Sequence, residues 1–224
     1  MKEDIHLMPR YILHNGRGAS ATVSFQGAQV LSWKTEHGEE LLFTSKKFRN
    51  QGTQEQYGFA REKIWLYEKD PPPLLGDFSG KAFVDLLLKP QEEDRKVWPH
   101  SDVRVEGLDT LNYLDKLLQN QCFTEQGCSL SFESEVDRVY IETNNMVAVL
   151  DHQKRRTFVI RKDGLPDIVV WNPWKKKSKA IKDIGNEEYM HMLCVDSASV
   201  ENPITLKPGQ EWTGRLELSL LLSS

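Results

Sequence analysis

A carboxylate at the end of an apolar run is the first candidate for chemistry in this chain of 224 residues. Residues 192–197 read Met-Leu-Cys-Val-Asp-Ser, so Asp196 follows four apolar positions and is expected to be partly desolvated. A carboxylate in such surroundings can act as a general base. A capped or solvent-exposed aspartate is the alternative that the pattern leaves open.

Two further clusters could bind a sugar phosphate. The segment 56–61 places the amide of Gln56 and the guanidinium of Arg61 around a glycine turn, and an arginine fork matches phosphate oxygens. In the segment 135–140, Asp137 could accept hydrogen bonds from vicinal hydroxyls. The alternatives are an exposed arginine where a strand begins and an alternating strand edge with solvated charges.

A fourth cluster reads Trp-Asn-Pro-Trp-Lys-Lys-Lys over residues 171–177. Tryptophan faces pack well against sugar C–H groups, and the lysines could attract anions. A structural corner followed by a solvated lysine run is the alternative. The chain has no glycine-rich phosphate loop, zinc-ligand spacing or nucleophile elbow.

The elements that must position these clusters are mostly short strands. Runs of β-branched and aromatic residues alternate with Gly, Asn and Pro turns about every 8–12 residues, a spacing typical of a sandwich or barrel. The expected strands are 10–14, 22–25, 29–34, 40–44, 59–67, 82–88, 103–106, 129–132, 138–141, 146–150, 156–162, 167–171, 192–196, 203–206 and 211–221. One or two helical turns are expected at 91–97, and leucines at helical spacing predict a short helix at 110–118. We expect a single all-β domain over residues 1–224.

Composition narrows the partners and the compartment. The net charge of −4 and the pI of about 5.9 argue against broad binding to nucleic acid or to an anionic membrane. Three cysteines, an odd number without metal-ligand spacing, suit a reducing compartment. The first residues have neither a secretory nor a transit-peptide pattern, so we expect a cytoplasmic monomer.

Taken in order, the segments resemble the aldose 1-epimerase superfamily, and within it the glucose-6-phosphate 1-epimerase branch that includes the plant apospory-associated protein C type. The matching segments are Gly-Ala-Gln-Val-Leu-Ser-Trp at 27–33, Gly-Phe-Ala-Arg at 58–61, Val-Arg-Val-Glu-Gly-Leu at 103–108, Val-Val-Trp-Asn-Pro-Trp at 169–174 and Ile-Thr-Leu-Lys-Pro-Gly-Gln-Glu-Trp at 204–212. The resemblance implies a galactose-mutarotase-like β-supersandwich. It also implies an isomerase that interconverts the α and β anomers of hexose 6-phosphates by acid/base ring opening, without metal or cofactor.

The resemblance also assigns roles to particular residues. It places the catalytic carboxylate, which acts as general base, on Asp196. It assigns the substrate-binding glutamine, arginine and aspartate to Gln56, Arg61 and Asp137.

The departures from the family pattern bear directly on turnover. Family members carry glutamate at the position of Asp196, and a site histidine is here Tyr57. The loop after Ser45 lacks an Arg-Gly-Gly-Ile-Pro segment. After Ser101 the chain continues directly to Asp102, where family chains run through several strands to a His-Thr-Tyr-Phe motif that carries the general acid. The sequence therefore predicts an internally truncated sandwich without its general-acid histidine.

Three functions compete on this basis. The first is an impaired glucose-6-phosphate 1-epimerase. The second is a non-catalytic module that binds a sugar phosphate, and the third is a non-functional splice product. The presence or absence of the acid histidine discriminates the first from the others.

Overall fold

The computed structural model describes residues 9–43, 64–68, 82, 84, 86–87, 97–98, 103–181, 184–207 and 210–222. The chain forms two compact units, each described here by itself. The first comprises Met1–Leu42 and Gly52–Asp94, and the second Phe43–Gln51 and Arg95–Ser224. The expectation of a single domain stays a prediction.

The first unit contains a three-stranded antiparallel sheet in the order β1-β2-β3, with β1 (Arg10–His14), β2 (Ser20–Ser24) and β3 (Val30–Lys34). The predicted Asn-Gly turn joins β1 to β2. The Asn15 side-chain oxygen accepts hydrogen bonds from the backbone N–H groups of Arg17 and Ala19, at 3.0 and 2.9 Å. A second pair in this unit joins β4 (Leu66–Tyr67) to β5 (Leu86–Leu87).

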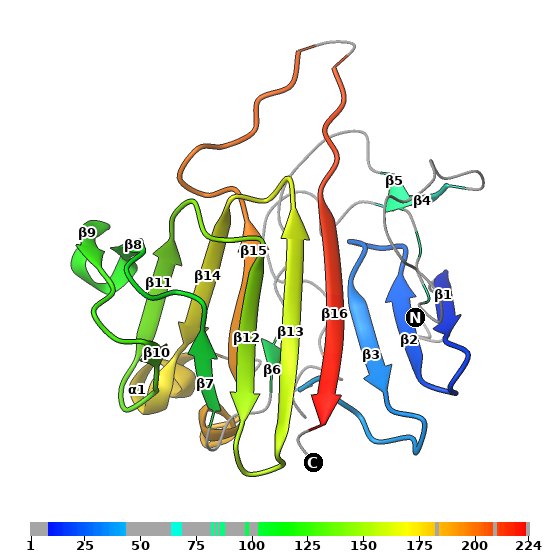
Figure 1. Cartoon of the computed structure of the whole chain (residues 1–224), viewed down its shortest axis with the longest axis horizontal. Coiled ribbons are helices and arrows are strands. Elements are labelled where there is room, and N and C mark those ends of the chain that lie inside the picture. Colours follow the sequence, from blue (N-terminus) through cyan, green and yellow to red (C-terminus); the bar gives the residue numbers. More distant parts are fainter. Residues whose placement is uncertain are drawn as a thin grey trace. The chain divides into compact units, whose positions relative to one another are not determined.

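The second unit contains two larger sheets, and Figure 1 shows the five-stranded sheet in front of the six-stranded one. The five-stranded sheet has the order β10-β7-β12-β13-β16, with β10 (Ser129–Leu130), β7 (Val103–Glu106), β12 (Met146–Asp151), β13 (Arg156–Asp163) and β16 (Arg215–Leu222). The six-stranded sheet has the order β6-β15-β14-β11-β8-β9, with β6 (Val97–Trp98), β15 (Leu193–Ala198), β14 (Asp167–Asn172), β11 (Val136–Tyr140), β8 (Asn112–Asp115) and β9 (Gln121–Thr124). Its helical segments are η4 (Lys116–Leu118), α1 (Trp174–Ala180) and η5 (Glu188–His191). The expected all-β sandwich with short helices is confirmed.

Alternating residues of the two sheets form the core of the second unit. One face of the six-stranded sheet buries Val136, Tyr140, Ile168, Val170, Leu193 and Val195, and one face of the five-stranded sheet buries Val103, Val105, Val147, Val149, Phe158 and Ile160. Each set follows the period of two that strands impose, and two such faces pack as a sandwich. The opposite face of the six-stranded sheet is therefore left to carry other chemistry.

Strand β13 places a charged residue at each end of its buried face. The side chains of Arg156, Phe158, Ile160 and Lys162 alternate along it, and all four are buried. The Arg156 guanidinium pairs with Asp151 at 2.9 Å and lies over the Phe158 ring at 4.9 Å. At the other end, the Lys162 ammonium donates to the carbonyls of Thr143, Leu165 and Pro166 at 3.3, 2.6 and 3.0 Å. Both charges are therefore stabilised at the rims of the core.

The helix predicted at 110–118 is wrong. Residues Asn112–Asp115 form β8, and a 3-10 turn, Lys116–Leu118, leads to β9. The ring of Tyr113 packs against those of Tyr140 and Phe123, with centroids 5.2 and 5.8 Å apart, whereas Leu117 and Leu118 are exposed. Cross-strand aromatic contacts favour the strand over the helical spacing of the leucines.

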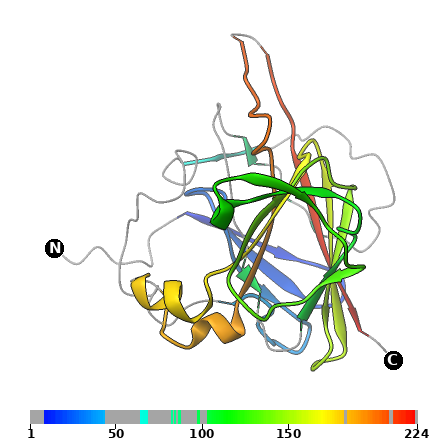
Figure 2. The same ribbon diagram turned by 90° about the vertical axis from the view of Figure 1, so that its left-hand side faces the viewer.

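Other predicted elements differ in detail. Residues 203–206 are not a strand, and β16 begins at Arg215 rather than at residue 211. The segment between β15 and β16 instead extends beyond the ends of the sheets (Figure 2), where the Trp212 ring N–H donates to the Gly164 carbonyl at 3.1 Å. Helix α1 was not predicted. Residues 91–96, 59–63, 83, 85 and 88 of the predicted elements lie outside the described residues.

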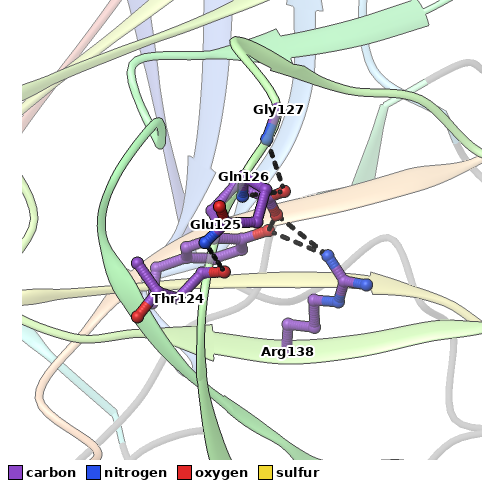
Figure 3. A network of polar contacts seen from close by, with 6 residues as sticks. Thr124, Glu125, Gln126, Gly127 and Arg138 are labelled. Atoms are coloured by element: carbon purple, nitrogen blue, oxygen red, sulfur yellow. Dashed lines mark hydrogen bonds and ion pairs between the residues drawn. The ribbon is translucent and has the colours of Figure 1, made fainter.

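A partly buried polar network ties the β8–β9 hairpin to β11 (Figure 3). The Arg138 guanidinium lies 3.0 Å from the Glu125 carboxylate and 4.3 Å from the centre of the Tyr113 ring. The Tyr140 hydroxyl donates to the same carboxylate at 2.7 Å, and the N–H groups of Gln126 and Gly127 donate to its other oxygen. Burial raises the pKa of Tyr140 well above its ordinary value, Arg138 opposes the rise and Glu125 adds to it.

This network predicts a specific dependence of stability on pH. Because the pKa of Tyr140 is raised in the folded state, its contribution is complete below the unfolded value of 10.0 and is lost as the pH rises above it. We expect Tyr140→Phe to lower the free energy of unfolding by about 1–2 kcal/mol at neutral pH. The variant should also lose less stability than the wild type above pH 10.0.

Urea unfolding at neutral and alkaline pH measures both effects. Tyr113→Phe is the matched control, because it keeps the aromatic contacts and leaves the hydrogen bonds of Glu125 in place. Equal alkaline losses in Tyr140→Phe and the wild type would contradict the role assigned to this hydroxyl.

Candidate active site

Asp196 lies on β15 with its side chain on the face of the six-stranded sheet that is opposite the sandwich core. Only 2% of the residue is exposed, so the solvent-exposed alternative is wrong. Strand β15 continues to Ala198, and Asp196 is therefore inside the strand rather than at its end. The carboxylate is more deeply buried than the sequence predicted.

Two apolar clusters flank Asp196 on this face. On one side lie Trp171, Ile184, Met192 and Cys194, with Phe43 and Ile181 packed against them. On the other side lie Val139, Val169 and Ala198, with Leu114 and Val200. A carboxylate between apolar side chains loses much of its hydration, which is the environment that favours acid/base function in enzymes.

The strand register places Asp137 on the same face as Asp196. Asp137 is opposite Trp171, Trp171 is opposite Cys194, and Asp196 is two residues further along β15. Two strand spacings and two residues correspond to a Cα separation of about 12 Å. The two predicted site carboxylates of this unit therefore lie on one face of the sheet, two strands apart.

Helix α1 supplies a cation to Asp137. The Lys177 ammonium lies 3.3 Å from the Asp137 carboxylate and 3.2 Å from that of Glu135. The lysine run was predicted to attract anions, and this lysine pairs with two carboxylates of the protein itself. The other two lysines of the run, Lys175 and Lys176, are exposed. Asp137 is thus held in place by a partly exposed ion pair.

The Trp-Asn-Pro-Trp segment forms a corner fixed by its asparagine. The Asn172 amide donates to the carbonyls of Tyr189 and Met192 at 2.9 and 2.6 Å, and its oxygen accepts from the Trp174 N–H at 2.8 Å. Trp174 has a positive φ of 50°, a conformation that is costly for a bulky residue. The asparagine therefore holds a strained tryptophan at the beginning of α1.

The two tryptophans of this corner differ in what they can contact. Trp171 is 6% exposed and packs in the apolar cluster beside Cys194, so it is structural. Trp174 is half-buried, and its ring packs against Tyr189 with centroids 5.3 Å apart. Both readings of this segment therefore apply, a structural corner at Trp171 and a partly open aromatic face at Trp174.

The remaining positions of interest are the two predicted substrate-binding residues, the tyrosine at the family's histidine position, and two histidines that were not predicted as site residues. Gln56, Arg61, Tyr57 and His100 lie outside the described residues. His152 is exposed in the turn between β12 and β13 of the other sheet. No histidine occurs within the six strands that form the face bearing Asp196.

Sequence reasoning missed two residues of this region, Cys194 and Asn172. The Cys194 thiol lies 2.7 Å from the Asp196 carboxylate, and the spacing of two residues along a strand was the available signal. The three hydrogen bonds of Asn172 join segments up to 20 residues apart, and no local sequence pattern predicts them.

Comparisons with known proteins agree with this architecture. A family model described as aldose 1-epimerase matches residues 96–219. A Cenchrus ciliaris protein named as a candidate glucose-6-phosphate 1-epimerase is 42% identical over 283 aligned positions, which cover 97% of this chain and 86% of the relative. The chain belongs to the aldose 1-epimerase family. Within that family it falls in the glucose-6-phosphate 1-epimerase branch, as the resemblance predicted.

Solved structures share the fold at low sequence identity. The crystal structure of HI1317 superposes with a TM-score of 0.70 at 19% identity, covering 97% of this chain and 94% of that one. A Salmonella typhimurium protein described as a candidate mutarotase gives 0.63 at 18% identity, covering 87% of both chains. The expected mutarotase-like sandwich is confirmed. Among the described residues, no helix is long and apolar enough to cross a membrane.

Proposed function

We propose that this chain binds hexose 6-phosphates and interconverts their α and β anomers by acid/base ring opening, at a rate much reduced by the loss of its general acid. The observation that carries the proposal is the shared face of Asp137 and Asp196, two strands apart with Asp196 desolvated between apolar clusters. In this proposal the protein is an isomerase that needs neither metal nor cofactor.

Each proposed residue has a distinct task. Asp196 takes the proton of the anomeric hydroxyl as general base, and Asp137 accepts hydrogen bonds from ring hydroxyls. Gln56 binds the sugar and Arg61 binds the phosphate, because a guanidinium fork matches phosphate oxygens. Ring opening also needs a proton donor at the ring oxygen. Without that donor the reaction loses the rate enhancement of general acid catalysis, about 10²–10⁴-fold.

Two observations support the loss of the donor. The strands that form the face around Asp196 contain no histidine. The alignment with the Cenchrus ciliaris relative runs over 283 positions, more than the 224 residues of this chain, so the relative has residues at many positions where this chain has none. This is consistent with an internal deletion after Ser101.

The same observations favour a second candidate, a binding module that holds a hexose 6-phosphate without turnover. For both candidate functions, we propose that the protein is a cytoplasmic monomer. Its three cysteines form no disulfide with one another, which suits a reducing compartment.

Calorimetry and NMR exchange test the proposal together. We expect the chain to bind glucose 6-phosphate more tightly than glucose, and Arg61→Ala to weaken binding of the phosphate ester about tenfold while binding of glucose is unchanged. We expect little acceleration of anomer exchange. Arg161→Ala is the matched control, because this arginine is exposed on β13 of the other large sheet.

Two results would contradict parts of the proposal. Equal weakening of both ligands by Arg61→Ala would exclude the phosphate role of this arginine. Rapid exchange that Asp196→Ala abolishes would show that the chain retains a proton donor and is a competent epimerase.

A further inference from the structure

The Cys194 thiol and the Asp196 carboxylate form a buried contact within one strand. The sulfur lies 2.7 Å from the Asp196 Oδ2 atom, and the two residues are 1% and 2% exposed. Residues two apart on a strand point to the same face, which brings the two side chains together. The thiol carries the hydrogen and donates, and the carboxylate accepts.

Most of the described side chains around this contact are apolar. Strand β14 presents Val169 and Trp171 beside it, and the next strand, β11, presents Asp137 and Val139. In such surroundings a hydrogen bond to Oδ2 is stronger than the same bond in water.

A hydrogen bond at one carboxylate oxygen also fixes the direction of the other. Rotation about the terminal side-chain torsion of aspartate is broad, so the carboxylate plane is set by its contacts. Aspartate is one methylene shorter than glutamate, and small errors in the position of a catalytic group are expensive. A donor that comes from the same strand holds this short side chain with little added freedom.

The geometry points to Cys194 as a positioning residue that orients the Asp196 carboxylate toward the anomeric centre of the sugar. The inference rests on the proposed function, because it takes Asp196 as the group that meets the substrate. It assigns to Cys194 no proton transfer and no covalent step.

The first test reads the thiol directly and needs no activity. In a Cys122→Ser/Cys128→Ser background the only remaining thiol is that of Cys194, since the chain has three cysteines. We expect its S–H stretching band in the infrared spectrum to move to higher wavenumber when Asp196→Ala removes the acceptor. Asp196→Asn, which preserves the shape, should give a smaller shift in the same direction and serves if the alanine variant does not fold.

The second test measures the consequence for the ligand. We expect Cys194→Ala to weaken binding of glucose 6-phosphate, and any anomer exchange, by about three- to tenfold. Cys194→Ser keeps a donor and should remain within about twofold of the wild type. Cys128→Ser is the control for loss of a thiol elsewhere, and thermal unfolding checks that each variant is folded.

The outcomes distinguish the positioning role of Cys194 from the proposed function of the chain. An S–H band that does not shift in either Asp196 variant overturns the positioning role. A Cys194→Ala variant that binds glucose 6-phosphate with wild-type affinity also overturns it. A band that responds, with affinity lost in the alanine variant and kept in the serine variant, supports it. If the wild-type chain binds no hexose 6-phosphate, the proposed function fails, while a responding band still supports the contact between Cys194 and Asp196.

Discussion

Replacing Asn172 with alanine is expected to lower the free energy of unfolding by about 3–4 kcal/mol. Asn172 has no exposed surface, and its side chain makes three hydrogen bonds to backbone groups of Trp174, Tyr189 and Met192. The substitution removes these partners from buried groups and leaves a cavity. It also removes the hydrogen bond that the Trp174 N–H donates in its left-handed conformation.

Urea unfolding measures the loss, with Asn144→Ala, at an exposed asparagine, as the control. Because Met192 leads directly into β15, we expect the same variant to weaken sugar-phosphate binding through Asp196. A change in stability below about 1 kcal/mol would show that the corner between β14 and α1 does not depend on this amide.

Replacing Arg156 with methionine is expected to lower the free energy of unfolding by about 3–5 kcal/mol. The guanidinium and the Asp151 carboxylate, 2.9 Å apart, are both buried, so removal of the cation leaves a buried carboxylate without its counterion. Lost packing over the Phe158 ring adds to the effect. Most of the loss in stability comes from the Asp151 carboxylate, which is left buried without its counterion.

A double variant separates the stranded charge from lost packing. Asp151→Asn together with Arg156→Met should recover part of the stability that Arg156→Met loses, because neither charge of the pair is then buried. Arg161→Met, on the same strand but exposed, is the control and should change stability by less than about 0.5 kcal/mol. Additive losses in the double variant would show that the two side chains are not coupled.

The strands were the most predictable part of the fold, for a physical reason. The strands at 103–106, 146–150 and 156–162 end within one residue of the predicted ends, and the first two alternate buried residues with more exposed ones. Alternation is a local signal, so a sequence records it directly.

Elements that depend on tertiary contacts were missed or misread. Leucine spacing favoured a helix at 110–118, but the rings of Tyr140 and Phe123 hold Tyr113 in a strand. Helix α1 has no apolar stripe and follows a proline, and its beginning depends on Asn172. In both cases the deciding contacts come from residues distant in the sequence.

The candidate site was predictable by residue type and not by arrangement. Motif resemblance selected Asp137 and Asp196, yet only the register of β11, β14 and β15 shows that they share a face. Register is a property of paired strands, and no single strand specifies it. The roles of Gln56 and Arg61 stay predictions, because both lie outside the described residues.

The alternation of side chains along β15 determines which insertions and deletions leave Asp196 on its face of the sheet. The deletion that we propose before β7 would leave the pairing of β11, β14 and β15 intact. One residue inserted between Cys194 and Asp196 would instead turn the carboxylate into the interior, toward the level of Ile168 and Val170. A large deletion outside these three strands is therefore expected to disturb the orientation of Asp196 less than a single-residue insertion within β15.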